Sequence, residues 1–179
     1  KVIYVGFRNV SQVLKVSYPS GEVLQAYGKI TSDNSISQNL FCGQHSCRRS
    51  ADGLLYLFNN GCSITAAPRV TMLKEPVAER DTLAKVWEFE CPVAPFKNLP
   101  QAMPNRRVLF SSGGSVSELP DGAFLVSTCS PYSMVFIVNR NKEILWSCEP
   151  EKWNIAKSEW VPLQQYRTSM IDGPDDLAK

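Results

Sequence analysis

The amino-acid sequence predicts an all-β fold made of repeated antiparallel sheets, and three patterns support this prediction. Short apolar runs recur along the 179 residues, separated by turn residues. The dipeptides Asp52-Gly53 and Asp121-Gly122 stand between such runs, and Asp-Gly at this position is typical of a β-hairpin turn. A tryptophan recurs near the end of a strand-like run, at Trp87 and at Trp146. Together these patterns indicate a repeated unit of four strands.

Two copies of this unit are complete and one is partial. The strands of the middle copy are expected at residues 45–50, 54–58, 69–73 and 84–89. The strands of the last copy are expected at residues 115–119, 124–127, 134–138 and 143–147. The first copy lacks its opening strand, and its remaining strands are expected at residues 2–7, 13–16 and 22–27.

Four antiparallel strands per unit, repeated about every 40 to 50 residues, are typical of the blades of a β-propeller. The predicted organisation is a partial blade at residues 1–28, a loop at 29–43, a blade carrying His45 at 44–90, a loop at 91–112, a blade at 113–149 and a C-terminal segment at 150–179. An antiparallel β-sandwich is the alternative, and the repeated tryptophans favour the propeller. The chain would cover roughly the last three to three and a half blades, which cannot close a ring, so the missing blades would come from the same protein or from another chain.

Charge and hydropathy argue against two kinds of partner. The sequence has 19 lysine and arginine residues against 17 aspartate and glutamate residues, a net charge of +2. This net charge is too small to produce the strongly positive surface with which proteins bind nucleic acid. No run approaches the roughly 18 apolar residues that a membrane-spanning helix needs. We therefore expect neither nucleic-acid binding nor a membrane span. The six cysteines leave the redox compartment open.

His45 is the only histidine and the first candidate for chemistry. It lies between Cys42 and Cys47, so three interpretations other than catalysis are open. The imidazole could be a structural group satisfied by the backbone. The three side chains could hold zinc, although their spacing fits no usual structural site and no fourth ligand is evident. The two cysteines could also form a disulfide that ties the loop.

Topology brings further candidates to the same place. Successive strands of a blade alternate in direction, so the start of the first strand and the end of the second lie on one face. His45 opens the first strand of the middle unit, while Arg8 and Asn59 each close a second strand. An imidazole, a guanidinium and carboxamides on one face could bind a tetrahedral oxyanion. Turn capping is the alternative role for Arg8 and Asn59.

An ordered set of short motifs runs through most of the chain. The motifs lie at residues 5–16 and 21–24, at Gly43-Gln44-His45, at residues 57–61, 69–70 and 86–89, at residues 114–122 and 144–146, and at Tyr166-Arg167. Taken together, they resemble the aryl-sulfate sulfotransferases that work without an adenylyl-sulfate donor. Asn59 stands where that family usually has an aspartate.

The resemblance implies a six-bladed propeller in a periplasmic or secreted protein. It implies that His45 becomes transiently sulfurylated and that Arg8 binds the sulfate. We expect no cofactor and no metal. Asn59, Asn9 and Gln44 are the predicted substrate-binding residues. The partners would be an aryl sulfate donor and a phenolic acceptor, and the family's other functional residues would come from preceding blades. The alternative function is a non-catalytic propeller that binds an anionic ligand or a protein.

Overall fold

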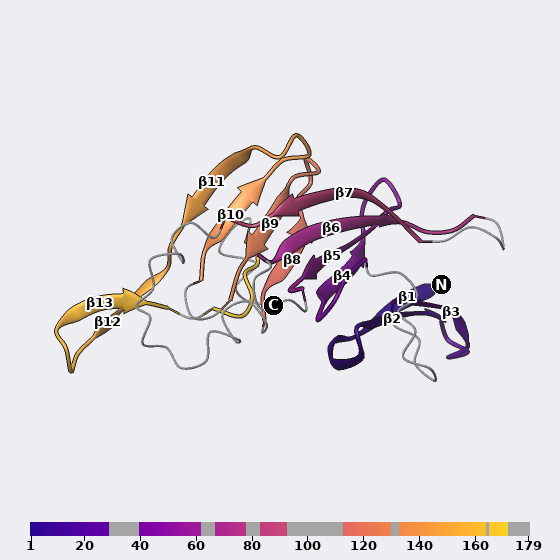
Figure 1. The fold of residues 1–179 in the computed structure, drawn as a ribbon, viewed down its shortest axis with the longest axis horizontal. Helices are drawn as coiled ribbons and strands as arrows, with labels where there is room; N and C mark the ends of the chain where they lie inside the picture. The colour runs from indigo at the N-terminus through magenta and orange to yellow at the C-terminus, as the bar shows by residue number, and fades with distance from the viewer. Residues whose placement is uncertain are drawn as a thin grey trace.

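The computed structural model of the chain describes residues 1–28, 40–61, 67–77, 83–92, 113–129, 133–163 and 165–171. Within these ranges the strands form four antiparallel sheets, and the short 3-10 turn at Arg8–Val10 is the single helical element. The predicted all-β class is therefore confirmed (Figure 1). The predicted loops at 29–43 and 91–112 lie largely outside the described residues.

The first sheet is the predicted partial unit. It consists of β1 (Val2–Phe7), β2 (Gln12–Ser17) and β3 (Val23–Gly28), hydrogen-bonded in that order. Because β1 and β2 are antiparallel, the 3-10 turn that joins them holds Arg8 at one end of the sheet. The strand boundaries agree with those expected from the sequence to within about one residue.

The middle sheet is the predicted unit that carries His45. Its strands are β4 (His45–Arg49), β5 (Leu55–Asn59), β6 (Arg69–Lys74) and β7 (Ala84–Glu90), again in sequence order. His45 is the first residue of β4 and pairs with Phe58. The imidazole therefore lies at the N-terminal end of β4, as the sequence predicted.

The third sheet is the last predicted unit. It contains β8 (Ser115–Glu118), β9 (Phe124–Ser127), β10 (Val135–Val138) and β11 (Ile144–Cys148) in sequence order. The tight turns before β9 and β11 are closed by backbone hydrogen bonds, including one from the Leu119 amide to the Ala123 carbonyl.

A two-stranded hairpin follows that the sequence patterns did not predict. It pairs β12 (Glu151–Asn154) with β13 (Glu159–Pro162) and projects away from the other sheets (Figure 1). Trp153 and Trp160 are directly paired across it, with their rings edge to face at 5.6 Å. The Asn154 carboxamide accepts backbone N–H groups from the turn. Both strands are largely exposed, so they do not need the alternating apolar residues of a core strand. The sequence therefore carries no strand pattern from which this hairpin could be predicted.

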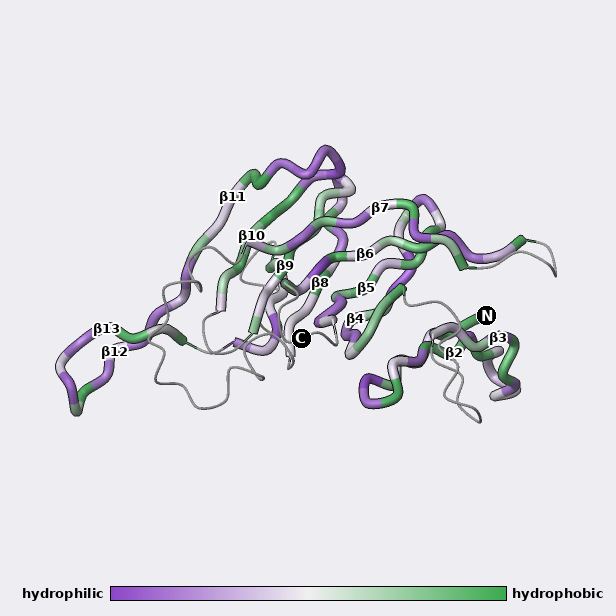
Figure 2. The backbone as a smooth tube through the Cα atoms, in the orientation of Figure 1, coloured by the Kyte–Doolittle hydropathy of each residue, from purple (hydrophilic) through white to green (hydrophobic). Residues whose placement is uncertain are grey.

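The middle sheet is buried on both of its faces. Side chains of a strand alternate between faces, so Leu55 and Leu57 of β5 pack toward the first sheet, while Tyr56 and Phe58 pack toward the third. The core toward the third sheet contains Tyr56, Phe58, Val70, Met72, Cys91, Val116, Phe124, Val126, Phe136 and Val138. Figure 2 shows hydrophobic positions along β5, β6 and β10, which carry these cores. Three sheets in series with two cores differ from the two layers of a sandwich.

The middle sheet lies between the first and the third sheets and packs against both of them. The edge strand β4 of the middle sheet contacts β1 of the first sheet and β8 of the third sheet. Trp87 of β7 packs on Phe124 of the third sheet with ring centroids 5.6 Å apart, and its indole N–H donates to the Arg140 carbonyl at 2.8 Å. Trp146, at the equivalent place in β11, is 49% exposed. The described strands form open sheets, and these sheets do not close into a ring. The prediction of an all-β fold is confirmed, whereas the propeller remains a prediction.

Polar contacts hold the first sheet against the middle one. The Glu75 carboxylate, which follows β6, accepts hydrogen bonds from Tyr4 (2.7 Å), Tyr27 (2.5 Å) and Lys15 (2.9 Å), one residue from each strand of the first sheet. Gln44, directly before β4, donates through Nε2 to the Gln12 carbonyl at 2.8 Å. These contacts fix the position of the β1–β2 turn relative to β4.

Candidate functional site

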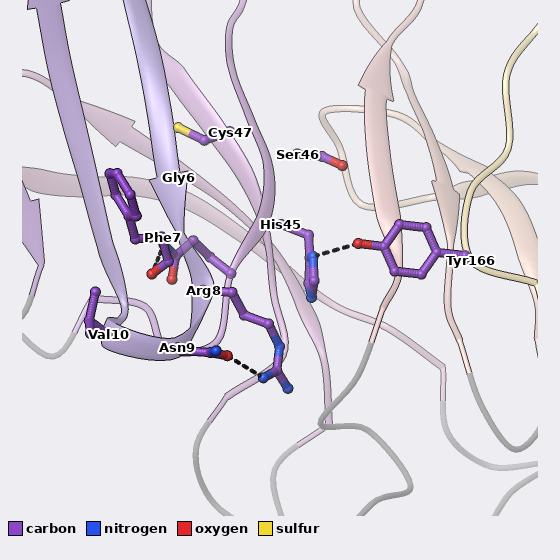
Figure 3. Close-up of a pocket in the computed structure, with 10 residues that line it drawn as sticks. Gly6, Phe7, Arg8, Asn9, Val10, His45, Ser46, Cys47 and Tyr166 are labelled. Atoms are coloured by element: carbon purple, nitrogen blue, oxygen red, sulfur yellow. Dashed lines mark hydrogen bonds between the residues drawn. The ribbon is translucent and has the colours of Figure 1, made fainter.

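A cavity of about 630 Å³ opens where the β1–β2 turn, the start of β4 and the C-terminal segment meet. It is lined by Gly6, Phe7, Arg8, Asn9, Val10, Gln44, His45, Ser46, Cys47 and Tyr166. Figure 3 shows that these side chains come from three separate parts of the chain. The packing of the first sheet on the middle sheet therefore creates the cavity.

His45 uses one of its ring nitrogens within the protein. Its Nδ1 lies 3.2 Å from the hydroxyl of Tyr166, and the two rings meet edge to face at 87° with centroids 5.8 Å apart. The other nitrogen, Nε2, is buried and has no hydrogen-bond partner among the described residues. A buried ring nitrogen without a partner is unusual, because buried polar atoms are normally satisfied. Nε2 is thus the ring atom whose hydrogen-bonding capacity the described residues leave unused.

The environment keeps the His45 ring neutral. Burial lowers the pKa of His45 below its ordinary value of 6.5, and the positive charge of Arg8 lowers the pKa further. Both causes disfavour the imidazolium form. At neutral pH the ring therefore carries a lone pair, as a nucleophile or a base requires.

Arg8 and Asn9 lie on the 3-10 turn between β1 and β2, and they line the same cavity as His45. Nη1 of Arg8 donates to Oδ1 of Asn9 at 3.0 Å. In Figure 3 the guanidinium and the imidazole extend in the same direction from the two neighbouring sheets. The structure thus brings together four of the five predicted site residues around one cavity, with a cation beside an imidazole.

Gln44 lines the same cavity, but its amide nitrogen is already used. Nε2 donates to the carbonyls of Gln12 and Phe7, at 2.8 and 3.4 Å. Only 2% of the residue is exposed, and Oε1 has no partner in the part of the chain that the structure describes. The Gln44 amide nitrogen therefore positions β4 on the first sheet, which leaves it no free donor for the substrate-binding role predicted for this residue.

Asn59 does not line the cavity. Its Oδ1 accepts hydrogen bonds from the backbone N–H groups of Cys42 and Gly61, at 2.9 and 3.0 Å. This is the turn-capping role that the sequence left as the alternative. The geometry gives no support to Asn59 as a substrate-binding residue, because its side-chain oxygen already accepts from the loop before His45 and from its own turn.

The cysteine interpretations are also resolved. Cys47 is a free thiol, whereas Cys42 is in a disulfide. The interpretation in which Cys42 and Cys47 form a disulfide is therefore excluded. Burial raises the pKa of the Cys47 thiol to about 12, with a further contribution from Glu75, so a thiolate suited to zinc is disfavoured there. No group of three or more metal-ligating side chains occurs in the described ranges.

Tyr166 is the site residue that the sequence reasoning did not assign. In the sequence it belongs only to the terminal Tyr166-Arg167 motif, yet its hydroxyl contacts the imidazole of His45, 121 positions earlier in the chain. No spacing or periodicity could have linked the two, because the contact depends on how the C-terminal segment returns across the third sheet. A tyrosine beside a short Gln-Gln sequence carries no local signal of its own.

No family model matches the sequence, and no curated protein matches it. None of the helices in the described part of the chain is long and apolar enough to cross a membrane. The function must therefore be argued from the cavity itself.

Proposed function

We propose that the chain is the C-terminal part of a β-propeller with aryl-sulfate sulfotransferase activity, and that His45 carries the sulfuryl group between donor and acceptor. The observation that carries the proposal is the buried, unpartnered Nε2 of His45 in a cavity that also holds Arg8. An uncharged nucleophilic nitrogen beside a fixed cation is the combination that transfer of an anionic group needs.

The chemistry is a two-step exchange. The Nε2 lone pair of His45 attacks the sulfur of an aryl sulfate, so that an N–S bond forms, the S–O bond to the aryl group breaks, and a phenolate leaves. The oxygen of an acceptor phenol then attacks the same sulfur, the N–S bond breaks, and the phenolic proton passes through solvent to the departed phenolate. No net oxidation or proton loss occurs.

Arg8 supplies charge stabilisation in both steps. Its planar guanidinium can donate two parallel hydrogen bonds to sulfate oxygens. Asn9 accepts from Nη1 and so restricts the rotation of the guanidinium. Because loose transfer of a charged group depends mainly on positioning and electrostatics, removal of Arg8 should lower turnover by about 10²- to 10³-fold.

The packing pattern supports a larger propeller. In the alignment of the units Ile3 corresponds to Leu55, and Leu55 packs against the preceding sheet. Ile3 is 48% exposed, on the face of the first sheet turned away from the middle sheet, and Trp146 is exposed at the opposite end. Both outer faces thus resemble interfaces, and we propose that further blades, from the same protein or another chain, cover them.

The disulfide at Cys42 supports a periplasmic or secreted location. Disulfides persist in oxidising compartments and are rare in the cytosol. The compartment is therefore proposed together with the activity.

The test uses the full-length protein with a chromogenic aryl sulfate and a phenol. We expect phenolate release that depends on the acceptor, loss of release in His45→Ala, and the reduction given above in Arg8→Ala. Arg48→Ala is the matched control, since Arg48 is an exposed arginine on the same strand as His45 and does not line the cavity. Undiminished turnover in His45→Ala would refute the proposal.

Two other outcomes identify other functions. Release that does not depend on the phenol would indicate hydrolysis of the sulfate ester. Sulfate binding without release would indicate a non-catalytic binding module, for which Arg8 and the open cavity suffice.

A further inference from the structure

Tyr166 is held in front of His45 by the third sheet. The backbone N–H of Gln165 donates to the Ser133 hydroxyl at 2.5 Å, and the backbone N–H of Thr168 donates to the Ser115 hydroxyl at 3.3 Å. Between these two anchors the Tyr166 ring packs close to Gly113, where an added Cβ would lie 3.0 Å from Cδ2. The hydroxyl of Tyr166 is therefore placed by fixed contacts on both sides.

The hydrogen bond between Tyr166 and His45 can run in either direction, and the direction decides which nitrogen is the nucleophile. If the hydroxyl donates to Nδ1, the ring proton must be on Nε2. If Nδ1–H donates to the hydroxyl oxygen, Nε2 carries the lone pair. The partner of one ring nitrogen thus sets the state of the other.

The surroundings of Nε2 favour the second arrangement. An Nε2–H group would be a buried donor without an acceptor among the described residues. It would also point its positive end into a region that already contains the Arg8 guanidinium (Figure 3). An unprotonated Nε2 also lacks a partner, but its lone pair is attracted by the positive charge of Arg8 that an Nε2–H would meet unfavourably. The Tyr166 oxygen is available as the acceptor for Nδ1–H at 3.2 Å.

We propose that Tyr166 is a positioning residue whose hydroxyl oxygen accepts a hydrogen bond from Nδ1–H of His45, which fixes the tautomer with a lone pair at Nε2. The catalytic consequence rests on the function proposed above. When Nε2 forms its bond to sulfur, the ring becomes positively charged while keeping its proton on Nδ1. The hydrogen bond to Tyr166 then stabilises that charge, and no proton has to leave the ring.

The tautomer can be measured without substrate. His45 is the only histidine, so long-range ¹H–¹⁵N correlation spectra show a single imidazole. We expect the ¹⁵N shifts of a protonated Nδ1 and an unprotonated Nε2 in the neutral ring. Tyr166→Phe keeps the ring contact but removes the oxygen, and should lower the ratio of the Nδ1–H to the Nε2–H tautomer about tenfold. Tyr18→Phe is the control, because Tyr18 is also exposed and does not line the cavity.

Two spectral results would overturn the proposal. One is a predominant Nε2–H tautomer in the unmodified protein, and the other is the same tautomer ratio in Tyr166→Phe as in Tyr18→Phe. Neither result depends on sulfuryl transfer, so the tautomer assignment stands or falls separately from the enzymatic function.

A kinetic experiment on the full-length protein tests the consequence. Tyr166→Phe should lower kcat about 10- to 100-fold with little change in KM for the aryl sulfate. The acid limb of the pH–rate profile should move to lower pH, because the imidazolium loses an acceptor while Arg8 and Cys47, the other ionisable groups lining the cavity, stay unchanged. An unmoved acid limb would contradict the positioning role.

Discussion

The contact between Glu75 and the first sheet gives a sharp stability prediction, because one carboxylate joins all three strands of that sheet to the middle sheet. The same contact helps to place Arg8 beside His45. Glu75→Ala removes an acceptor that serves Tyr4, Tyr27 and Lys15 at 2.5 to 2.9 Å. Hydrogen bonds to a charged group each contribute about 1.5 to 3 kcal/mol. The Lys15 side chain is 28% exposed, so water replaces part of the loss. Removing one partner of a fully buried charged pair costs about 3 to 5 kcal/mol. Because the pair of Lys15 and Glu75 is only part-buried, we expect a smaller loss, about 2 kcal/mol.

The control for this change is Glu90→Ala. Glu90 also pairs with a cation, Arg69, at 2.9 Å, but its side chain is 59% exposed. Exposed pairs contribute less than about 1 kcal/mol. Urea unfolding followed by tryptophan fluorescence measures both free energies of unfolding. Equal losses in the two variants would refute the conclusion that Glu75 holds the sheets together.

The same contact predicts a pH dependence. Burial alone would raise the pKa of Glu75, but the hydrogen bonds from Tyr27, Tyr4 and Lys15 outweigh it and hold the pKa below its ordinary value of 4.5. The folded state therefore binds fewer protons at this group than the unfolded state. The stabilisation is complete above pH 4.5 and disappears as the pH falls through the lower folded pKa. The stability gap between the unmodified protein and Glu75→Ala should narrow in that acidic range, and a constant gap would contradict the assignment.

Two further predictions concern the core and the cavity wall. Gly114→Ala should destabilise the protein by about 3 kcal/mol, because the new Cβ would lie 2.2 Å from a ring carbon of Phe58 at a φ of +93°. Gly122→Ala has a similar φ but open space around it, and should cost about 1 to 2 kcal/mol, so equal unfolding midpoints would exclude the steric cause. Cys47 should react with iodoacetamide at pH 8 far more slowly in the folded than in the unfolded protein, because its thiol pKa is raised to about 12. Equal rates, followed by mass spectrometry of the tryptic peptide, would show that the thiol is not buried.

The strand pattern could be predicted from the sequence because it depends on local chemistry. The Asp52-Gly53 turn and the apolar run of β5 define a hairpin without reference to the rest of the chain. The position of His45 at the start of β4 followed from the same pattern. Antiparallel alternation then placed Arg8 at the same end, as the cavity shows.

The roles of the amides could not be predicted in the same way. An asparagine at a strand end can bind a ligand or cap a turn, and only the three-dimensional contacts show that Asn59 caps the loop at Cys42. The role of Gln44 likewise depends on its contact with another sheet, because its amide nitrogen donates to the Gln12 carbonyl of β2. The contact between Tyr166 and His45 arises from the path of the C-terminal segment, which no local pattern encodes.

Detection of the covalent intermediate tests the central claim most directly. The full-length protein would be mixed with an aryl sulfate in the absence of phenol, quenched at alkaline pH, digested and examined by mass spectrometry. We predict one added sulfuryl group on the peptide that contains His45, lost when phenol is supplied before the quench and absent in His45→Ala. A sulfuryl group on a different peptide, or acceptor-dependent transfer without any modified histidine, would contradict the account.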